Sequence, residues 1–579
     1  MKKAVFPAIA SVLTVAISHS FLVAASALLF VTCLSLSAQV APTLEPVRID
    51  QNLRPAPQPK SVPRKELKLN NQQLAPKEAA ALAFTFKELV FEGNASLTSE
   101  QLAVLWAHKV GDTVTVEEVF ALANAITKHY AEAGYALCFG VVPEQDIKDG
   151  KVRIVVVEGF VSGHSLGVVW PTGRAKGAVD AQVQRILGSK PLRSDVLERQ
   201  VLLMDDLPGW SVGSVLSASP KVIGGSDLAL DFMREPDVYD VSWNNFLPGA
   251  LDRQVVGAAW SGFGHLDGSD ELSLGYYRSP QGDAYRSFNA SASTLIGTDG
   301  ERLGVTFSQS DSRPTDPLLV PLEFTGRSRN ARLSLTKPLL RSRAATLVAE
   351  GYLGAQEAGS SMLAGPPTID RLRAIGAALT YDFALADQST NLVRLGYEQG
   401  VAGLGATGNS RINGSPEYSV LSLDFTRTAP LAASGSATFS YSFALQGQAS
   451  LGSPLLSPVE AAFGGRQFGR AFDAGSMSGE QSLFGSLELR CALPISLGFA
   501  EPVRAQFYVF ADAGMMRQQG ELQPQEIRDR HAASAGLGVR LGLPRGLNAL
   551  VEVARPVTLP AGFTGDASHR INASFGARF

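Results

Sequence analysis

Charged residues in two neighbouring segments are the first candidates for chemistry in this chain. Residues 460–490 read EAAFGGRQFGRAFDAGSMSGEQSLFGSLELR, and Arg470 lies in their glycine-rich and aromatic first part. That part has no apolar run of helical length, so it predicts a long loop that feeds a strand. Further along, the sequence QFYVFADAG alternates, which places Phe510, Asp512 and Gly514 on one strand face. Asp512 is therefore predicted to point away from the apolar face of its strand.

Two short motifs suggest catalysis or cofactor binding, and their contexts argue against both. Residues 163–167 read GHSLG, like a serine-hydrolase elbow around Ser165, but an extended segment follows where the elbow needs a helix. Residues 403–408 read GLGATG, like a dinucleotide fingerprint, yet no helix follows to face a pyrophosphate. The seven histidines form no cluster of metal-site spacing. We predict no catalytic centre, no metal site and no cofactor.

The loop and strand motifs resemble those of a known superfamily. FGRAF at 468–472 is similar to the tip of the in-folded loop of polypeptide-transporting outer-membrane barrels, and FADAG at 510–514 matches their Phe-x-Asp-x-Gly strand. The resemblance is closest to two-partner secretion transporters, which export haemolysins and filamentous haemagglutinins. It implies that Arg470 docks on Asp512 inside a barrel. The predicted loop-to-barrel lock comprises Arg470, Asp512, Phe472, Phe510 and Gly514.

The loop tip departs from the family in one respect. The common order is Val-Arg-Gly-aromatic, whereas this chain has Gly469, Arg470, Ala471 and Phe472 in succession. The arginine and the aromatic residue are retained, while the glycine with its backbone freedom precedes the arginine instead of following it.

Composition favours a β-rich membrane protein. The chain has 579 residues, 56 glycines and 18% charged residues, and its 51 basic residues nearly balance 54 acidic ones. This balance gives no reason to expect a nucleic-acid partner. The three cysteines, Cys33, Cys138 and Cys491, are isolated and suggest no disulfide framework.

The first 83 residues predict a leader and a linker. Residues 1–38 have a basic start, a long apolar stretch and small residues near Ala38, which is typical of a signal peptide. An uncleaved membrane anchor is the alternative. Residues 39–83 are proline-rich and polar, as linkers are. Transporters of the resembled family often have a helix here that plugs the barrel; only 42–54 could supply it, and the sequence leaves this question open.

Residues 84–235 predict two α+β domains. The order in 84–159 is a strand at 84–91, two helices and two more strands, and it is similar to a polypeptide-transport-associated (POTRA) domain. A second POTRA-like copy is predicted at 160–235. An exposed strand edge could receive an extended substrate through main-chain hydrogen bonds. The candidate substrate-binding residues on the strand predicted at 135–142 are Tyr135, Leu137, Phe139 and Val141.

The last part, 236–579, predicts a transmembrane antiparallel β-barrel. Short alternating strands are separated by turn residues, and the length suits sixteen strands with the in-folded loop at 456–482. A two-sheet soluble sandwich would alternate in the same way, but the terminal aromatic residue and the signal peptide favour the barrel. Phe579 resembles the terminal signal by which such barrels are recognised for insertion.

These features predict an outer-membrane translocator and not an enzyme. It would recognise a large unfolded exoprotein with periplasmic POTRA domains and export it through the barrel. Its other expected contacts are outer-membrane lipid and, during biogenesis, the barrel-assembly machinery. The alternatives are a factor that inserts outer-membrane proteins, a passive porin and an outer-membrane hydrolase.

Overall fold

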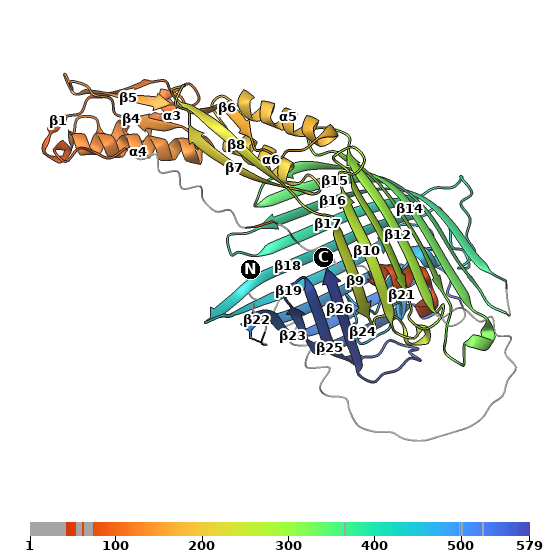
Figure 1. Cartoon of the computed structure of the whole chain (residues 1–579). Helices are drawn as coiled ribbons and strands as arrows, with labels where there is room; N and C mark the ends of the chain where they lie inside the picture. Colours follow the sequence, from red (N-terminus) through yellow and green to blue (C-terminus); the bar gives the residue numbers. More distant parts are fainter. Residues whose placement is uncertain are drawn as a thin grey trace.

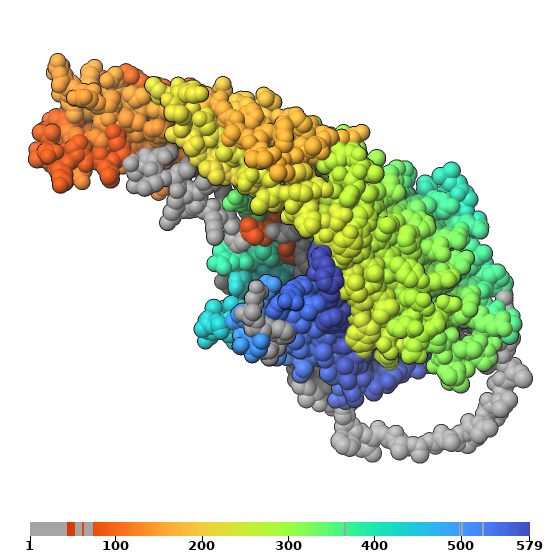
Figure 2. All heavy atoms as spheres, in the orientation of Figure 1, coloured from red at the N-terminus to blue at the C-terminus, as the bar shows by residue number. Residues whose placement is uncertain are grey.

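The protein consists of an elongated arm and a barrel (Figure 1). The computed structural model describes residues 42–53, 59, 61–62, 73–363, 366–496, 498, 502–523 and 526–579. The predicted signal peptide lies outside the described residues. Figure 2 shows the arm, built from the two POTRA-like domains, extending sideways from one rim of the barrel.

The first POTRA-like domain forms a three-stranded sheet in the order β2-β5-β4, packed on helices. Thr115 caps its long helix through a capping box with Glu118, and Gly134 with φ +92° follows the helix end. The elements are β1 (Ala83–Thr85), β2 (Glu88–Glu92), α3 (Ser99–Ala103), η3 (Ala107–Lys109), β3 (Thr113–Thr115), α4 (Val116–Glu132), β4 (Phe139–Val141) and β5 (Lys151–Val157).

Two strand predictions in this domain were wrong in their extent. The strand predicted at 84–91 is two strands, because β1 pairs with β3 while β2 pairs in parallel with β5. The strand predicted at 135–142 is only β4, since the chain turns at 136–137 before it. Cys138 is fully buried beside this turn, and burial raises the pKa of its thiol to about 12, so the thiol is protonated and inert.

The second domain repeats the plan and contacts the barrel directly. Its sheet has the order β6-β8-β7. Arg341 of the barrel lies 2.6 Å from Asp206 at the end of the second helix, and Arg199 lies 2.9 Å from Asp299 in a barrel turn. The elements are β6 (Phe160–Leu166), α5 (Gly173–Gly188), α6 (Ser194–Asp205), β7 (Trp210–Ala218) and β8 (Gly225–Arg234).

Sixteen antiparallel strands close into a barrel, which confirms the predicted architecture. The first strand pairs with the last, from Asp240 against Arg578 to Asn244 against Ser574. The strands are β9 (Val238–Asn244), β10 (Val255–Phe263), β11 (Glu271–Arg278), β12 (Tyr285–Leu295), β13 (Arg302–Ser312), β14 (Thr325–Arg341), β15 (Ala345–Ser361), β16 (Thr368–Ala384), β17 (Thr390–Gly400), β18 (Ser419–Ser434), β19 (Ala437–Ser450), β22 (Gln481–Ile495), β23 (Val503–Arg517), β24 (Asp529–Gly542), β25 (Leu547–Thr558) and β26 (Arg570–Arg578).

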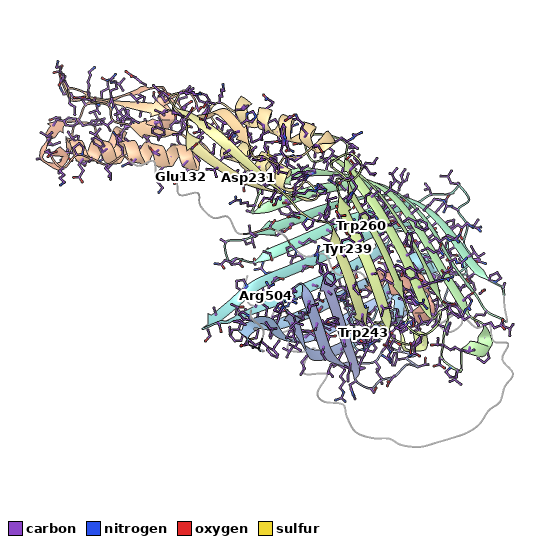
Figure 3. The ribbon with its side chains drawn as sticks, in the orientation of Figure 1. Glu132, Asp231, Tyr239, Trp243, Trp260 and Arg504 are labelled. Atoms are coloured by element: carbon purple, nitrogen blue, oxygen red, sulfur yellow. The ribbon has the colours of Figure 1, made fainter. Side chains whose placement is uncertain are left out.

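Side chains alternate between the outside and the inside of this wall. On β23, Phe507 and Val509 are exposed outward, while Phe510 and Asp512 are buried inside. In Figure 3 the labelled Tyr239, Trp243, Trp260 and Arg504 lie on the barrel, whereas Glu132 and Asp231 lie on the arm. This is the parity of a barrel with lipid outside and polar groups inside.

A short helix occupies the lumen. η1 (Pro42–Leu44) and α2 (Pro46–Leu53) pack against the inner wall and contact β13 and β14 (Figure 1). Leu44 and Ile49 are buried with Leu247, Leu251 and Phe324. The sequence left the presence of a plug helix undecided, and the structure contains one. None of the helices in the described part of the chain combines the length and apolarity needed to cross a bilayer.

Candidate functional site

The in-folded loop connects β19 to β22 and contains a small hairpin, β20 (Ala461–Phe463) paired with β21 (Met477–Gly479). The hairpin tip carries the FGRAF motif. Gly469 has φ +74°, and a Cβ there would lie 2.4 Å from the ring of Phe463. The left-handed backbone conformation therefore occurs at residue 469, just before Arg470. This explains why the glycine precedes the arginine in this chain. Since β22 begins at Gln481, the loop ends two residues earlier than predicted.

The structure brings Arg470 and Asp512 together in bidentate geometry. Arg470 Nε donates to Asp512 Oδ2 at 3.0 Å, and Nη2 donates to Oδ1 at 2.7 Å. The backbone N–H of Arg470 also donates to Asp512 Oδ2 at 3.1 Å. Both residues are buried, with 5% and 2% of their surfaces exposed. Three hydrogen bonds thus connect the loop tip to a single carboxylate.

More wall groups complete this site, which we name the Arg470 centre: Arg470, Ser486, Glu488, Asp512 and Glu552. Arg470 Nη1 lies 2.6 Å from Glu488 and 3.4 Å from Glu552, and Nη2 donates to Ser486 Oγ at 3.0 Å. Two further wall arginines pair with Glu488: Arg540 at 2.8 Å and Arg490 at 2.7 Å. Three guanidinium groups therefore balance three carboxylates.

Aromatic rings surround the Arg470 centre. The guanidinium carbon of Arg470 lies 3.5 Å from the centroid of the Phe510 ring, a cation–π contact. Phe472 is 1% exposed and packs against Phe463. Phe463 in turn fits over Gly514, where an added Cβ would lie 2.4 Å from its ring. All five residues of the predicted lock therefore lie in one cluster.

The plug helix has its own buried ionic site, which we name the Arg48 centre: Glu45, Arg48, Arg411, Glu460, Glu480 and Glu526. Arg48 lies 2.7 Å from Glu45, the residue just before its helix, and 3.1 Å from Glu460 of the in-folded loop. Arg411, from the connection between β17 and β18, pairs with Glu480 and lies 3.2 Å from Glu526. Helix, loop and two barrel connections meet in this centre.

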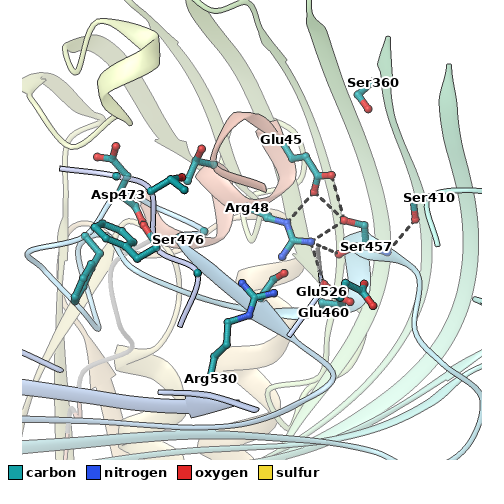
Figure 4. A pocket seen from close by; sticks show the side chains of 18 of the residues that line it. Glu45, Arg48, Ser360, Ser410, Ser457, Glu460, Asp473, Ser476, Glu526 and Arg530 are labelled. Atoms are coloured by element: carbon teal, nitrogen blue, oxygen red, sulfur yellow. Dashed lines mark hydrogen bonds and ion pairs between the residues drawn. The ribbon is translucent and has the colours of Figure 1, made fainter. Parts of the chain in front are cut away.

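A cavity of about 1400 Å³ borders the Arg48 centre. Figure 4 shows Arg48 reaching from α2 toward Glu45, Ser457 and Glu460, with Arg530 on the cavity wall. Arg48 Nη2 donates to Ser457 Oγ at 2.7 Å. This centre was not predicted from the sequence, although Glu45 and Arg48 stand at i,i+3 spacing where α2 begins.

The four residues predicted to bind substrate do not all lie on one strand. Phe139 and Val141 lie on β4, but Tyr135 and Leu137 precede it, so the prediction that all four line one strand edge was wrong. The Tyr135 ring faces the guanidinium of Arg193 at 5.6 Å, and Leu137 packs on the core of the second domain. Both residues belong to the junction of the two domains.

Phe579 lies at the seam that closes the barrel. Its N–H donates to the carbonyl oxygen of Tyr239 at 2.9 Å, and the N–H of Tyr239 donates to Phe579 at 3.1 Å. The Phe579 side chain is 70% exposed. An assembly factor could reach this ring, and its role as a signal stays a prediction.

The two catalytic motifs lie in non-catalytic contexts. Ser165 is on strand β6, and α5 begins only at Gly173. Residues 403–408 form part of an irregular connection between barrel strands. Within the described residues, no group of three or more His, Cys, Asp or Glu side chains is arranged to hold a metal ion.

Fold and site define a membrane β-barrel that is preceded by two POTRA-like domains and whose lumen holds a loop and a helix. The family profile "Haemolysin secretion/activation protein ShlB/FhaC/HecB" matches residues 224–541, more than half of the chain, and "POTRA domain, ShlB-type" matches 84–159. The chain therefore belongs to the ShlB/FhaC/HecB family. Its barrel lies in the outer membrane and its POTRA domains lie in the periplasm.

One known transporter resembles this chain in sequence, and two solved structures resemble it in fold. The heme/hemopexin transporter protein HuxB of Haemophilus influenzae is 26% identical over 273 residues, which are 45% of this chain and 46% of HuxB. The chain thus matches about half the length of this relative. CdiB from Escherichia coli shares the fold with a TM-score of 0.70 at 18% identity, over 90% of this chain and 94% of CdiB. BamA from Haemophilus ducreyi, lacking POTRA domains 1–3, gives 0.50 at 14% identity, over 86% and 100%.

Proposed function

We propose that this chain recognises one large partner protein in the periplasm and exports it, unfolded, through the barrel. The observation that carries the proposal is the pair of pieces in the lumen: a loop that follows β19 and a helix tethered through a linker. Both occupy the path through the barrel, and neither is part of its wall. Their withdrawal would open a polar passage in which a moving polypeptide backbone stays hydrated.

Membership of a secretion family agrees with this activity, and HuxB is itself described as a transporter. The barrel strands would contact outer-membrane lipid through their apolar face, and the barrel-assembly machinery would act during biogenesis. Neither a catalytic step nor a cofactor enters the proposal. Export would be driven by folding of the partner outside the cell.

The competing functions fit less well. An insertion factor shares the fold, as BamA does, but likeness at 14% identity concerns the fold alone. A passive porin would gain nothing from a buried loop lock and a plug. A hydrolase would need Ser165 on an elbow, and Ser165 lies on a strand.

The POTRA domains are expected to supply recognition while the barrel inserts alone. The test deletes residues 84–234 behind the signal peptide and measures two quantities: heat-modifiable barrel in the outer membrane and partner protein in the medium. The candidate partner to measure is any very large secreted protein found in the neighbouring open reading frame. Normal barrel with abolished secretion supports the proposal, whereas normal secretion by the deletion contradicts it.

A further inference from the structure

Arginines interrupt the apolar outer face of the barrel at one end of several neighbouring strands. On β14, Arg327 and Arg329 share a face with Leu333 and Leu335, whose side chains are exposed on the outside of the wall. The same alternation on β11, β12 and β16 places four more arginines on the outer face. The set, which we name the outer arginine patch, comprises Arg278, Arg286, Arg327, Arg329, Arg371 and Arg373.

The outer arginine patch lies at the extracellular end of these strands. β12 ends at Leu295, which is buried in the core of the second POTRA domain, so the beginning of β12, with Arg286, lies at the opposite rim. Strand pairing continues this level around the wall, because Arg278 stands opposite Arg286, and Asp311 stands opposite both Arg286 and Arg327. In Figure 1 this rim lies at the ends of β12 and β14 that point away from the arm. The patch therefore faces the outer leaflet of the membrane.

Apolar side chains begin next to the patch on the same outer face. Phe288 follows Arg286 by two positions, and its ring centroid lies 6.5 Å from that of Phe307 on β13. Both phenylalanine side chains are exposed on the outside of the wall. Charged side chains on the lipid face are costly at the middle of a bilayer and cost little near its interfaces. The change from rings to arginines therefore marks the level at which acyl chains meet headgroups.

Two carboxylates hold arginines of the patch in place. Asp311 lies 3.0 Å from Arg286 Nε and 2.6 Å from Arg327 Nε, and Glu357 lies 3.1 Å from Arg371 Nε. These three arginine side chains are about half exposed, at 49%, 52% and 44%. Among the residues that the structure describes, their guanidinium groups donate hydrogen bonds through Nε only. Their Nη groups are therefore positioned by the carboxylates and available to a further acceptor.

A hollow of about 430 Å³ lies within the patch. Arg286, Arg327 and Asp311 line it, together with the hydroxyl groups of Thr325 and Ser361, which lie 2.7 Å apart. Guanidinium groups bind phosphate through paired hydrogen bonds, and hydroxyl groups add further donors. This set of donors fits a phosphate group.

We propose that the outer arginine patch binds a phosphorylated glycolipid of the outer leaflet, of the lipid A class. Its phosphate groups contact the arginines, and its acyl chains lie along the neighbouring rings. Six arginines face only two carboxylates, Asp311 and Glu357, on these strands, which leaves positive charge for the phosphates. The proposal uses the location of the barrel in the outer membrane and is independent of the exported partner.

Binding is tested with the purified full-length protein in detergent and with two fluorescent probes: diphosphoryl lipid A and the same lipid without its phosphates. The wild type should bind the diphosphoryl form at least about tenfold more tightly, because only this form offers acceptors to the arginines. Arg286→Gln/Arg327→Gln should lose at least about tenfold in affinity for the diphosphoryl form only. Equal affinity of the wild type for both probes, or unchanged affinity in the double variant, overturns the proposal.

Arg517→Gln/Arg555→Gln is the matched control. Arg517 on β23 and Arg555 on β25 face outward on another part of the wall, and Arg517 pairs with Asp529 at 2.6 Å. This variant removes the same amount of charge and should keep the wild-type affinity. A loss as large as that of Arg286→Gln/Arg327→Gln would show attraction to the barrel as a whole and overturn the site. Heat-modifiable mobility verifies that each variant is a folded barrel, and Arg371→Gln/Arg373→Gln repeats the test at the other end of the patch.

Phosphatidylglycerol distinguishes the glycolipid from other anionic lipids. It also carries a phosphate and acyl chains, but no phosphorylated sugar. It should displace labelled diphosphoryl lipid A from the wild type at least about tenfold less effectively than unlabelled diphosphoryl lipid A does. Equal displacement would show a general site for anionic lipids and overturn the assignment to a glycolipid. None of these measurements depends on secretion, so a failure of the proposed function would leave their results intact.

Discussion

The two buried ionic centres in the lumen differ in completeness. The Arg470 centre joins the loop to the barrel wall, and its three carboxylates meet three guanidinium groups. The Arg48 centre joins the helix, the loop and the barrel connections to one another, and four carboxylates meet two guanidinium groups within ion-pair distance.

Hydrogen bonding shows the same contrast. Within the described residues, every buried side-chain N and O atom of the Arg470 centre has a partner, whereas Glu480 Oε2 and the nearby Gln518 Oε1 have none. Buried polar networks stabilise a structure only when every member is satisfied. We infer that the Arg470 centre is the stable attachment and that the Arg48 centre is the one that opens first.

The largest expected effect is that of Arg470→Ala, which breaks the complete centre. Removing one partner of a buried ion pair costs about 3–5 kcal/mol, because the remaining carboxylates stay buried without it. Both partners are buried, so water screens the pair little and the cost stays in this range. Partner secretion should fall at least tenfold while the amount of barrel in the membrane stays near wild type.

Two controls isolate this effect. Arg466→Ala removes an exposed arginine of the same loop and should leave secretion nearly unchanged. The double variant Arg470→Ala/Asp512→Ala should be no worse than Arg470→Ala alone, because the two residues act as one pair. Additive defects in the double variant would show that they act separately.

Gly514→Ala tests whether shape also holds the loop. The added methyl group would overlap the buried ring of Phe463, and overpacking of this kind costs about 1–3 kcal/mol. We expect a several-fold loss of secretion, measured per barrel. Ala513→Val on the same strand points to lipid and should be neutral; an equal loss in both variants would indicate a general defect of β23.

Arg48→Ala opens the incomplete centre and should change conductance more than secretion. The helix loses its bonds to Ser457 and Glu460, so the open channel becomes more populated in planar bilayers. Secretion should stay within about threefold of wild type, since the helix must leave during export in any case. Gln51→Ala, on an exposed position of the same helix, is the control. A secretion defect as large as that of Arg470→Ala would remove the distinction between the centres.

Removing Phe579 affects neither centre and should have the smallest effect on secretion per inserted barrel. The exposed ring at the seam is expected to act in assembly, so the amount of barrel falls while each inserted barrel secretes normally. Quantitative immunoblots of outer membranes, compared with secretion per barrel, provide the measurement. An unchanged amount of barrel with reduced secretion would contradict the assembly role.

Local periodicity predicted the barrel, whereas the Arg470–Asp512 pairing was implied by the resemblance of FGRAF and FADAG to the motifs of a known family. Strand parity placed Asp512 inside the barrel, because alternation follows from backbone geometry alone.

Contacts between residues far apart in the sequence could not be predicted from local patterns. Arg48 meets Glu460 across 412 positions, and no local pattern encodes such a pairing. The strand at 135–142 failed because apolar residues at 135 and 137 suit a strand as well as they suit a domain junction.

The residues that contact Arg470 follow it in the sequence, and their order bears on when the loop docks during barrel assembly. All wall contacts of Arg470 come from the strands that follow the loop, up to Asn572 of β26 at a separation of 102 positions. The loop can therefore settle on an open sheet of β22 to β26 before the remaining strands close around it, whereas the plug helix needs the finished cylinder. Short-range contacts form earlier than long-range ones. We expect crosslinks between loop and wall to appear before crosslinks between helix and loop during insertion, and the reverse order would refute this sequence of events.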